Sequence, residues 1–192
     1  MSSINKLSTT NSTYDSLYDS ITSYYFAELP TEFEHFCVYS ADGSETMANL
    51  SERDGSKILG EEVVSNITDF IEHLKTEYNI KNLWFSMFPP NTGIQTFCVN
   101  TPNTRFFVPL SENSRFFTYE MSNNHDAMEL MSTQFANKTS ITDFNVSFME
   151  TEGNVIHTLE TKSVYNLGLT GHLFHNDSND KLAFAIEFEL LV

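Results

Sequence analysis

The residues best suited to chemistry lie in two β-rich stretches of the chain, Trp84–Leu110 and His172–Leu190. Together they supply a thiol, a side-chain amide, an imidazole and two cations, groups that can act as nucleophile, metal ligand or anion-binding site. Each of these chemistries competes with a plainer structural role for the same side chain. The candidate pocket residues are Cys98, Asn100, Arg105, His172 and Lys181.

Cys98 would act as a nucleophile only if an adjacent imidazolium, a helix N-terminus or a cation lowered its pKa. Its local sequence is apolar and offers none of these, although His172 could approach from another strand. A buried, inert cysteine is the stronger interpretation. Serine-based hydrolysis is less favoured still, because the chain has no Gly-x-Ser-x-Gly motif.

A metal site would need several histidine and carboxylate side chains close together. His157, His172 and either Asp126 or Asp177 form one conceivable set. However, 6 histidines in 192 residues produce accidental neighbours, and the spacing of His172 and His175 places them on opposite faces of a strand. We therefore expect no metal, with His172 the first ligand to test if one is bound.

Arg105, Arg115 and Lys181 would form a small anion pocket if the fold brought them together. The planar guanidinium of arginine suits a carboxylate or a phosphate. The chain has 26 acidic residues against 10 basic ones, so ordinary ion pairing competes for the same cations. The composition favours ordinary pairing.

The order of motifs in the two stretches carries a family resemblance. A proline-rich turn, Pro89-Pro90, precedes a strand that contains Cys98-Val99-Asn100, and the next strand, Arg105–Leu110, opens with Arg and ends in Pro-Leu. Further on, His172 is followed four residues later by Asn176, and Lys181 comes nine residues after His172. In these respects the chain resembles iron- and 2-oxoglutarate-dependent oxygenases, especially the phage-type members of the aspartyl/asparaginyl hydroxylase-like branch.

The resemblance spans about Trp84–Leu190 and implies a double-stranded β-helix, or jelly-roll. It also implies a degenerate metal motif, because Cys98-Val99-Asn100 stands where the family has His-x-Asp. Iron(II) in such a site needs two imidazoles and a carboxylate, and only His172 would survive. The resemblance thus favours a non-catalytic binding protein. The alternative is an active oxygenase with Fe(II), 2-oxoglutarate and an unusual ligand set, in which Lys181 or Arg105 anchors the cosubstrate.

Hydrophobic spacing predicts a mainly β protein with one or two N-terminal helices packed on a sheet. Residues 1–13 form a polar arm, and residues 14–192 a single domain. Apolar residues recur at helical spacing over Tyr14–Phe26, capped by Thr13 or Asp15, and over Lys57–Tyr78, capped by Ser56. The expected strands are Phe33–Tyr39, Leu83–Phe88, Ile94–Asn100, Arg105–Leu110, Arg115–Glu120, Phe144–Thr151, Val155–Thr161, Ser163–Leu167, His172–Phe174 and Leu182–Val192.

The formal charge of −16 bounds the possible partners. A field of that sign repels nucleic-acid backbones and anionic membranes in the absence of a basic patch. It suits a protein partner with a basic surface, and a second alternative is an acidic mimic of DNA. Assembly of the chain into a homo-oligomer is a further alternative.

Localisation follows from the same survey. The first residues are polar, and no apolar run approaches the roughly 20 residues that span a bilayer. We expect a cytoplasmic protein. Because the family resembled here occurs in phage genomes, an accessory or virion protein in the host cytoplasm is a natural setting.

Overall fold

Two helices and ten strands make up the part of the chain that the computed structural model describes, residues 5–8, 11–24, 34–43, 59–90, 92–96, 104–111, 116–120, 155–161, 163–167, 172–176 and 178–192. The helices are α1 (Ser12–Ser23) and α3 (Glu61–Glu77). The strands are β1 (Asn5–Ser8), β2 (Glu34–Ser40), β3 (Ile80–Phe88), β4 (Thr92–Thr96), β5 (Arg105–Pro109), β6 (Phe116–Glu120), β7 (Val155–Leu159), β8 (Ser163–Asn166), β9 (His172–Asn176) and β10 (Ala183–Leu190).

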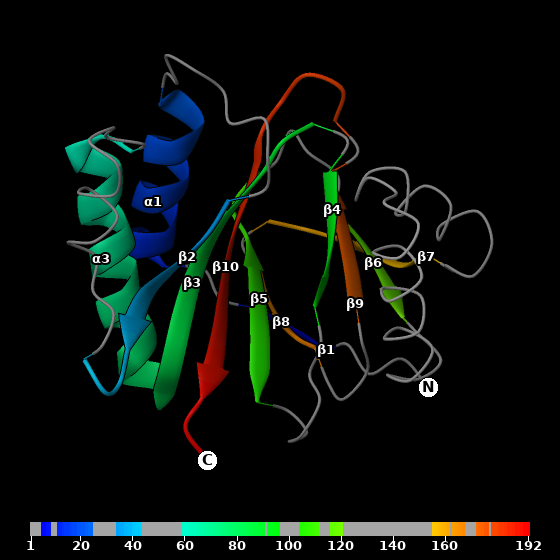
Figure 1. Ribbon diagram of the computed structural model, residues 1–192. Coiled ribbons are helices and arrows are strands. Elements are labelled where there is room, and N and C mark those ends of the chain that lie inside the picture. The colour runs from blue at the N-terminus through cyan, green and yellow to red at the C-terminus, as the bar shows by residue number, and fades with distance from the viewer. Residues whose placement is uncertain are drawn as a thin grey trace.

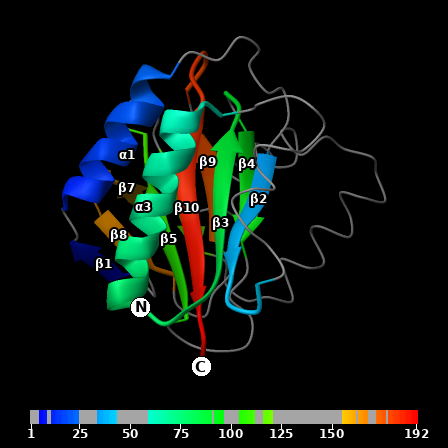
Figure 2. The same cartoon turned by 90° about the vertical axis from the view of Figure 1, so that its left-hand side faces the viewer.

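These elements form three layers, helices, sheet and sheet (Figure 1). One sheet has six strands in the order β1-β8-β5-β10-β3-β2, and the other has four in the order β4-β9-β6-β7. Figure 2 looks onto the helical layer and shows α1 and α3 in front of the six-stranded sheet. The protein is therefore mixed α and β, with mainly antiparallel β structure, as the sequence predicts.

The strand pairs are nested in sequence. β3 pairs with β10, β4 with β9, β5 with β8 and β6 with β7, each time antiparallel. Two further pairs, β5 with β10 and β6 with β9, join these hairpin-like pairs into sheets. The strands from β7 to β10 thus pair, in reverse order, with the strands from β3 to β6.

Alternate residues of the central strands face opposite layers, as the pleat of a strand requires. On β10, Ile186 and Phe188 join the core under the helices, whereas Ala183 and Ala185 join a smaller cluster with Leu159 of β7. Because β7 belongs to the four-stranded sheet, this second cluster fills the space between the sheets.

Helix α3 lies on the six-stranded sheet through one apolar stripe, and acidic residues in its first turn complement the helix dipole. The helix begins after Gly60, where a Cβ atom would lie 2.8 Å from the ring of Tyr24, so a larger residue would push that ring aside. The buried stripe consists of Val63, Ile67, Phe70, Ile71 and Leu74.

Helix α1 is tied both to α3 and to the sheet by Tyr14. This side chain is fully buried, its ring packs edge-on against Phe70, and its hydroxyl donates a 2.9 Å hydrogen bond to the carbonyl of Pro109 on β5. The helix starts with Asn11, whose side chain accepts a hydrogen bond from the Tyr14 amide. The cap is therefore Asn11 and not Thr13 or Asp15, because the helix begins two residues before the first expected aromatic.

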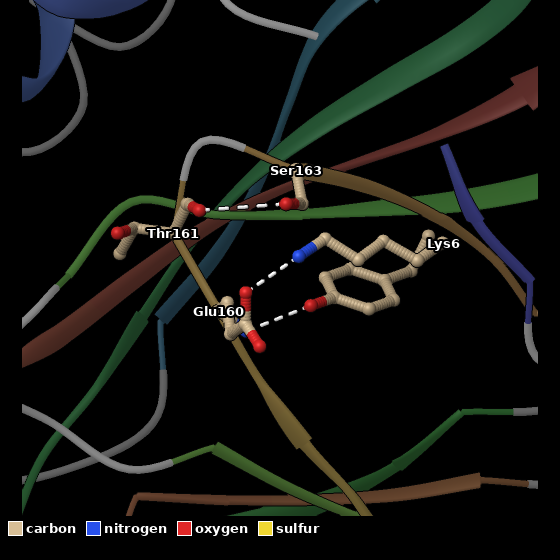
Figure 3. Close-up of polar contacts among 5 residues, drawn as sticks. Lys6, Glu160, Thr161 and Ser163 are labelled. Atoms are coloured by element: carbon tan, nitrogen blue, oxygen red, sulfur yellow. Dashed lines mark hydrogen bonds and ion pairs between the residues drawn. The ribbon is translucent and has the colours of Figure 1, made fainter. Parts of the chain in front are cut away.

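Strand β1 comes from the segment expected as a polar arm. Residues Asn5–Ser8 pair with Ser163–Asn166, so the body of the fold orders this part of the arm. Lys6 and Glu160 form an exposed ion pair at this edge of the sheet, next to the turn that carries Thr161 and Ser163 (Figure 3). Such a pair adds little stability by itself, and the backbone ladder is the main restraint.

Several boundaries differ from those expected. Helix α3 begins at Glu61 and not at Lys57, and strand β3 begins three residues before Leu83. The predicted cap Ser56 and the predicted strand Phe144–Thr151 lie outside the described residues.

Candidate functional site

The first two candidate pocket residues lie outside the described part of the chain. Cys98 and Asn100 follow β4, which ends at Thr96. Arg115, which was considered with Arg105 and Lys181 as part of an anion pocket, also lies outside the described part of the chain. The site is therefore built from His172, Arg105, Lys181 and the residues around them.

His172 begins β9, the second strand of the four-stranded sheet. Its backbone lies opposite Thr96 on β4 and Glu120 on β6. This register places His172 beside the C-terminal end of β4. His157 lies on β7, beyond β6, where it is paired with Thr118.

Lys181 lies in the turn that joins β9 to β10, and its side chain is exposed. Its backbone is held on both sides. The carbonyl accepts a 2.9 Å hydrogen bond from the side-chain amide of Asn176, and the amide donates to the Ser178 hydroxyl at 3.0 Å. The ammonium group thus points to solvent from a fixed turn.

Arg105 and Lys181 do not share a pocket. Arg105 is paired with Glu189 near the end of β10, whereas Lys181 precedes the start of that strand. Lys181 and Glu189 are eight residues apart, which is about 26 Å along an extended chain. Lys181 is also remote from His172. Strand β9 extends about 13 Å from His172 to Asn176, and the turn that carries Lys181 begins only after Asn176. The structure therefore separates Arg105 from Lys181, because the two residues lie toward opposite ends of β10.

Arg105 instead belongs to a polar cluster on the face of the six-stranded sheet that looks away from the helices. Its guanidinium lies 3.3 Å from a carboxylate oxygen of Glu187 and 5.1 Å from the ring of Trp84. Three neighbouring strands contribute these groups, with Glu187 directly opposite Trp84 in the β10–β3 register. The arginine thus makes an ion pair and a cation–π contact at the same time.

His35 and Ser86 extend the cluster to the edge strand β2. The His35 ring stacks on Trp84 with 5.9 Å between ring centroids, and its Nδ1 lies 2.9 Å from the Ser86 hydroxyl. His35 has an exposed edge, whereas Ser86 is fully buried. The cluster therefore runs from a buried carboxylate at Glu187 to solvent at His35.

Burial shifts the pKa values of two groups in this cluster, Glu187 and His35. Burial raises the pKa of Glu187, and the neighbouring Arg105 cation opposes that rise. The pKa of His35 is lowered from 6.5 to about 4, first because surrounding protein displaces water from the ring and then because Arg105 repels a second positive charge. His35 is thus neutral at physiological pH.

The arrangement suits stabilisation better than catalysis. A Ser–His pair is the start of a nucleophilic dyad, yet the Ser86 hydroxyl has no exposed surface from which to reach a substrate. Arg105 has the shape of an anion receptor, but its charge is already opposed by Glu187 at 3.3 Å. Each polar group in the cluster serves a neighbour in the fold.

Within the described ranges, no group of three or more histidine, cysteine, aspartate or glutamate side chains is arranged to hold a metal ion. Neither α1 nor α3 has the length and apolar character of a membrane-crossing helix.

Sequence reasoning selected Arg105 but missed the other members of its cluster, Glu187, Trp84, His35 and Ser86. One signal was available: Glu187 interrupts the otherwise apolar run Ala183–Phe188, and every residue of that run is buried. A carboxylate at a buried position almost always has a partner. The identity of that partner depends on strand pairing, which local sequence does not reveal.

Comparison with known proteins yields no family. No protein-family model matches the chain, and no curated protein sequence matches it.

Proposed function

We propose that the two sheets form a degenerate oxygenase-like jelly-roll that binds a protein partner and has no catalytic activity. The nested pairing of β3 to β10 supports the jelly-roll part of this proposal. Eight strands that pair first with last are what a long hairpin gives when it is rolled into two facing sheets, and the pairs β3–β10, β4–β9, β5–β8 and β6–β7 follow that rule.

The ion pair between Arg105 and Glu187 is the observation that carries the loss of catalysis. A 2-oxoglutarate oxygenase needs a free cation to hold the cosubstrate carboxylate. Arg105 forms an ion pair with Glu187, whose side chain is 2 % exposed. Lys181 is exposed and lies beyond the other end of β10. The Cys98-Val99-Asn100 sequence supplies neither the imidazole nor the carboxylate of a His-x-Asp pair.

The partner class follows from charge. A chain of net charge −16 attracts basic protein surfaces and accelerates their association at low ionic strength. The described helices contribute to this field, since both carry acidic residues in the first turn. A partner with a basic surface is therefore the best fit.

Iron and cosubstrate binding test the non-catalytic part. The purified protein is incubated anaerobically with Fe(II), desalted and analysed for metal, and its melting temperature is measured with and without 2-oxoglutarate. We expect substoichiometric iron and no shift. One iron per chain, with a 2-oxoglutarate shift that is lost in His172→Ala, would establish the oxygenase alternative instead.

Affinity capture tests the partner. The protein is immobilised and exposed to cell lysate at low and moderate salt, and retained proteins are identified and measured one at a time. A retained protein with a basic surface, whose affinity falls as salt rises, supports the proposal. Retention of DNA-binding proteins alone, displaced by free DNA, would favour the DNA-mimic alternative.

A further inference from the structure

A hollow of about 290 Å³ lies at the C-terminal end of α3, on the opposite side of the six-stranded sheet from the Arg105 cluster. Its wall is formed by the last turn of the helix, the link from Tyr78 to Ile80 and the ring of Tyr39 on β2. Polar residues and two tyrosines, Tyr39 and Tyr78, thus line the same concave surface.

The hollow already contains a positive charge. The ammonium of Lys75 lies 4.8 Å from the centroid of the Tyr39 ring and donates a 2.9 Å hydrogen bond to Glu72. That hydrogen bond raises the pKa of Lys75, so the group is charged at neutral pH. The aromatic face is therefore occupied by a cation of the chain itself.

The local electrostatics favour a cation for two further reasons. The last carbonyls of an α-helix carry partial negative charge, and the helix ends here, where the Tyr78 amide bonds to the Leu74 carbonyl. Glu77 also lines the hollow, and its carboxylate lies 3.3 Å from Nε2 of His73. A basic side chain that enters the hollow would meet an aromatic ring, a carboxylate and the negative end of a helix.

The floor of the hollow is rigid because it is part of the core. Tyr78 packs against Phe106 at 5.5 Å and against Phe188 at 5.2 Å, measured between ring centroids. Tyr39 is paired with Leu83 in the sheet. A ligand would therefore bind a surface that is formed beforehand, which lowers the entropy cost of binding.

We propose that this hollow receives a lysine or arginine side chain of the protein partner, and that Lys75 fills it in the free chain as an internal substitute. The inference rests on the proposed function, because it gives the basic partner a specific point of contact. On binding, the incoming cation displaces Lys75 from the face of Tyr39, while Glu72 keeps the displaced ammonium nearby.

Two matched lysine variants test the inference, with hexalysine peptide as the probe and calorimetry as the measurement. Lys75→Gln uncovers Tyr39 and releases Glu72. Lys81→Gln makes the same change in charge and releases Glu189, its partner at 3.5 Å, without touching Tyr39. We expect Lys75→Gln to bind hexalysine about two- to fivefold more tightly than Lys81→Gln, the range that a cation–π contact gives at an exposed site.

Tyr39 provides the second arm. In the Lys75→Gln background, Tyr39→Phe keeps the aromatic face and should keep the gain, whereas Tyr39→Leu should lose it. Circular dichroism and melting curves check that each variant is folded, and the Phe variant preserves the test if the Leu variant unfolds.

The outcomes separate this inference from the proposed function. Equal affinities for Lys75→Gln and Lys81→Gln, or no binding of hexalysine by any variant, would overturn the hollow as a cation site. Neither result restores iron or 2-oxoglutarate binding, which is measured separately through His172. Conversely, stoichiometric iron would end the non-catalytic proposal and leave the comparison of the two lysine variants unaffected.

Discussion

The two faces of the six-stranded sheet are built on different principles. The face under α1 and α3 is packed with large apolar side chains such as Phe188 and Ile186, and the hydroxyl of Tyr14 adds a single hydrogen bond to the sheet. The face toward the four-stranded sheet also buries large rings, those of Phe88 and Phe107, but it adds small residues such as Ala185 and a buried carboxylate, Glu187, that pairs with the partly exposed Arg105.

The difference teaches how each interface is specified. Apolar packing is non-directional, so the helical layer depends on volume and tolerates exchange among hydrophobic residues. Hydrogen bonds and ion pairs require particular atoms at particular distances, so the layer between the sheets depends on register. Substitutions on the two faces should therefore fail in different ways.

The largest expected effect is on the helical face. Phe188 is fully buried and its ring stacks on Phe106 with 4.8 Å between centroids. Phe188→Ala should lower the free energy of unfolding by about 3–5 kcal/mol through lost burial and a cavity, as measured by urea denaturation. Phe188→Leu should cost about half as much. Equal losses for the two variants would mean that ring geometry, not volume, dominates this face.

Asn176 should rank next, because it ties the two sheets together. Its amide nitrogen bonds to the carbonyls of Phe88 at 2.9 Å and Pro89 at 3.1 Å, and its oxygen accepts from the Ser178 amide at 3.1 Å. Asn176→Ala should cost about 2–4 kcal/mol, since buried backbone groups lose their partners.

Asn176→Asp is the matched control for this position. It keeps the size and the acceptor oxygen but replaces the donor nitrogen with an oxygen that faces carbonyls. We expect it to be at least as destabilising as alanine in the same urea experiment. A stable aspartate variant would show that the donor contacts contribute little.

The ion pair should respond asymmetrically. Arg105→Gln leaves a buried carboxylate without its cation and should cost about 3 kcal/mol. Glu187→Gln leaves a partly exposed arginine that water can solvate, and should cost about 1 kcal/mol. Chemical denaturation at pH 7 gives both values. A larger loss for Glu187→Gln would contradict the view that burial of the carboxylate sets the cost.

The smallest effect should be the pH dependence from His35. Its pKa is lowered to about 4, so between about pH 6.5 and pH 4 the unfolded chain binds a proton that the native ring refuses, and acidification weakens the fold. Glu187 acts in the opposite sense, because its raised pKa makes the native state bind a proton more readily and weakens the fold as pH rises.

His35→Gln isolates the histidine contribution. Its stability relative to the wild type should improve as pH falls from 7 to 4, by less than about 1 kcal/mol since the ring is partly exposed. Unfolding curves at four or five pH values provide the measurement. A wild-type advantage that grows on acidification would reverse the sign and refute the assignment.

Prediction from sequence succeeded where a pattern is local. The stripe from Val63 to Leu74 lies on one helix, and the strand predicted over Leu182–Val192 is observed as β10, so both can be read from neighbouring residues. The boundaries were less accurate. The start of α1 depended on Asn11, whose capping hydrogen bond is short-range but lies before the first apolar residue.

Prediction failed where the answer depended on pairing between distant strands. Arg105 was selected as a pocket residue, but its ion pair with Glu187 joins positions 82 residues apart. Lys181 and Arg105 were weighed together as members of an anion pocket, with ordinary ion pairing favoured, and the register of β10 places them toward opposite ends of that strand. Charge and residue type carry no information about register.

By itself the sequence determined the acidic charge, the amphipathic helices and the β-rich C-terminal region. Tertiary structure alone decided that Glu187 neutralises Arg105, that Asn176 joins the sheets and that Lys75 rests on Tyr39. The physical reason is the range of the interactions. Periodicity and composition act within a few residues, whereas hydrogen bonds and ion pairs across strands exist only after the chain has chosen its pairing.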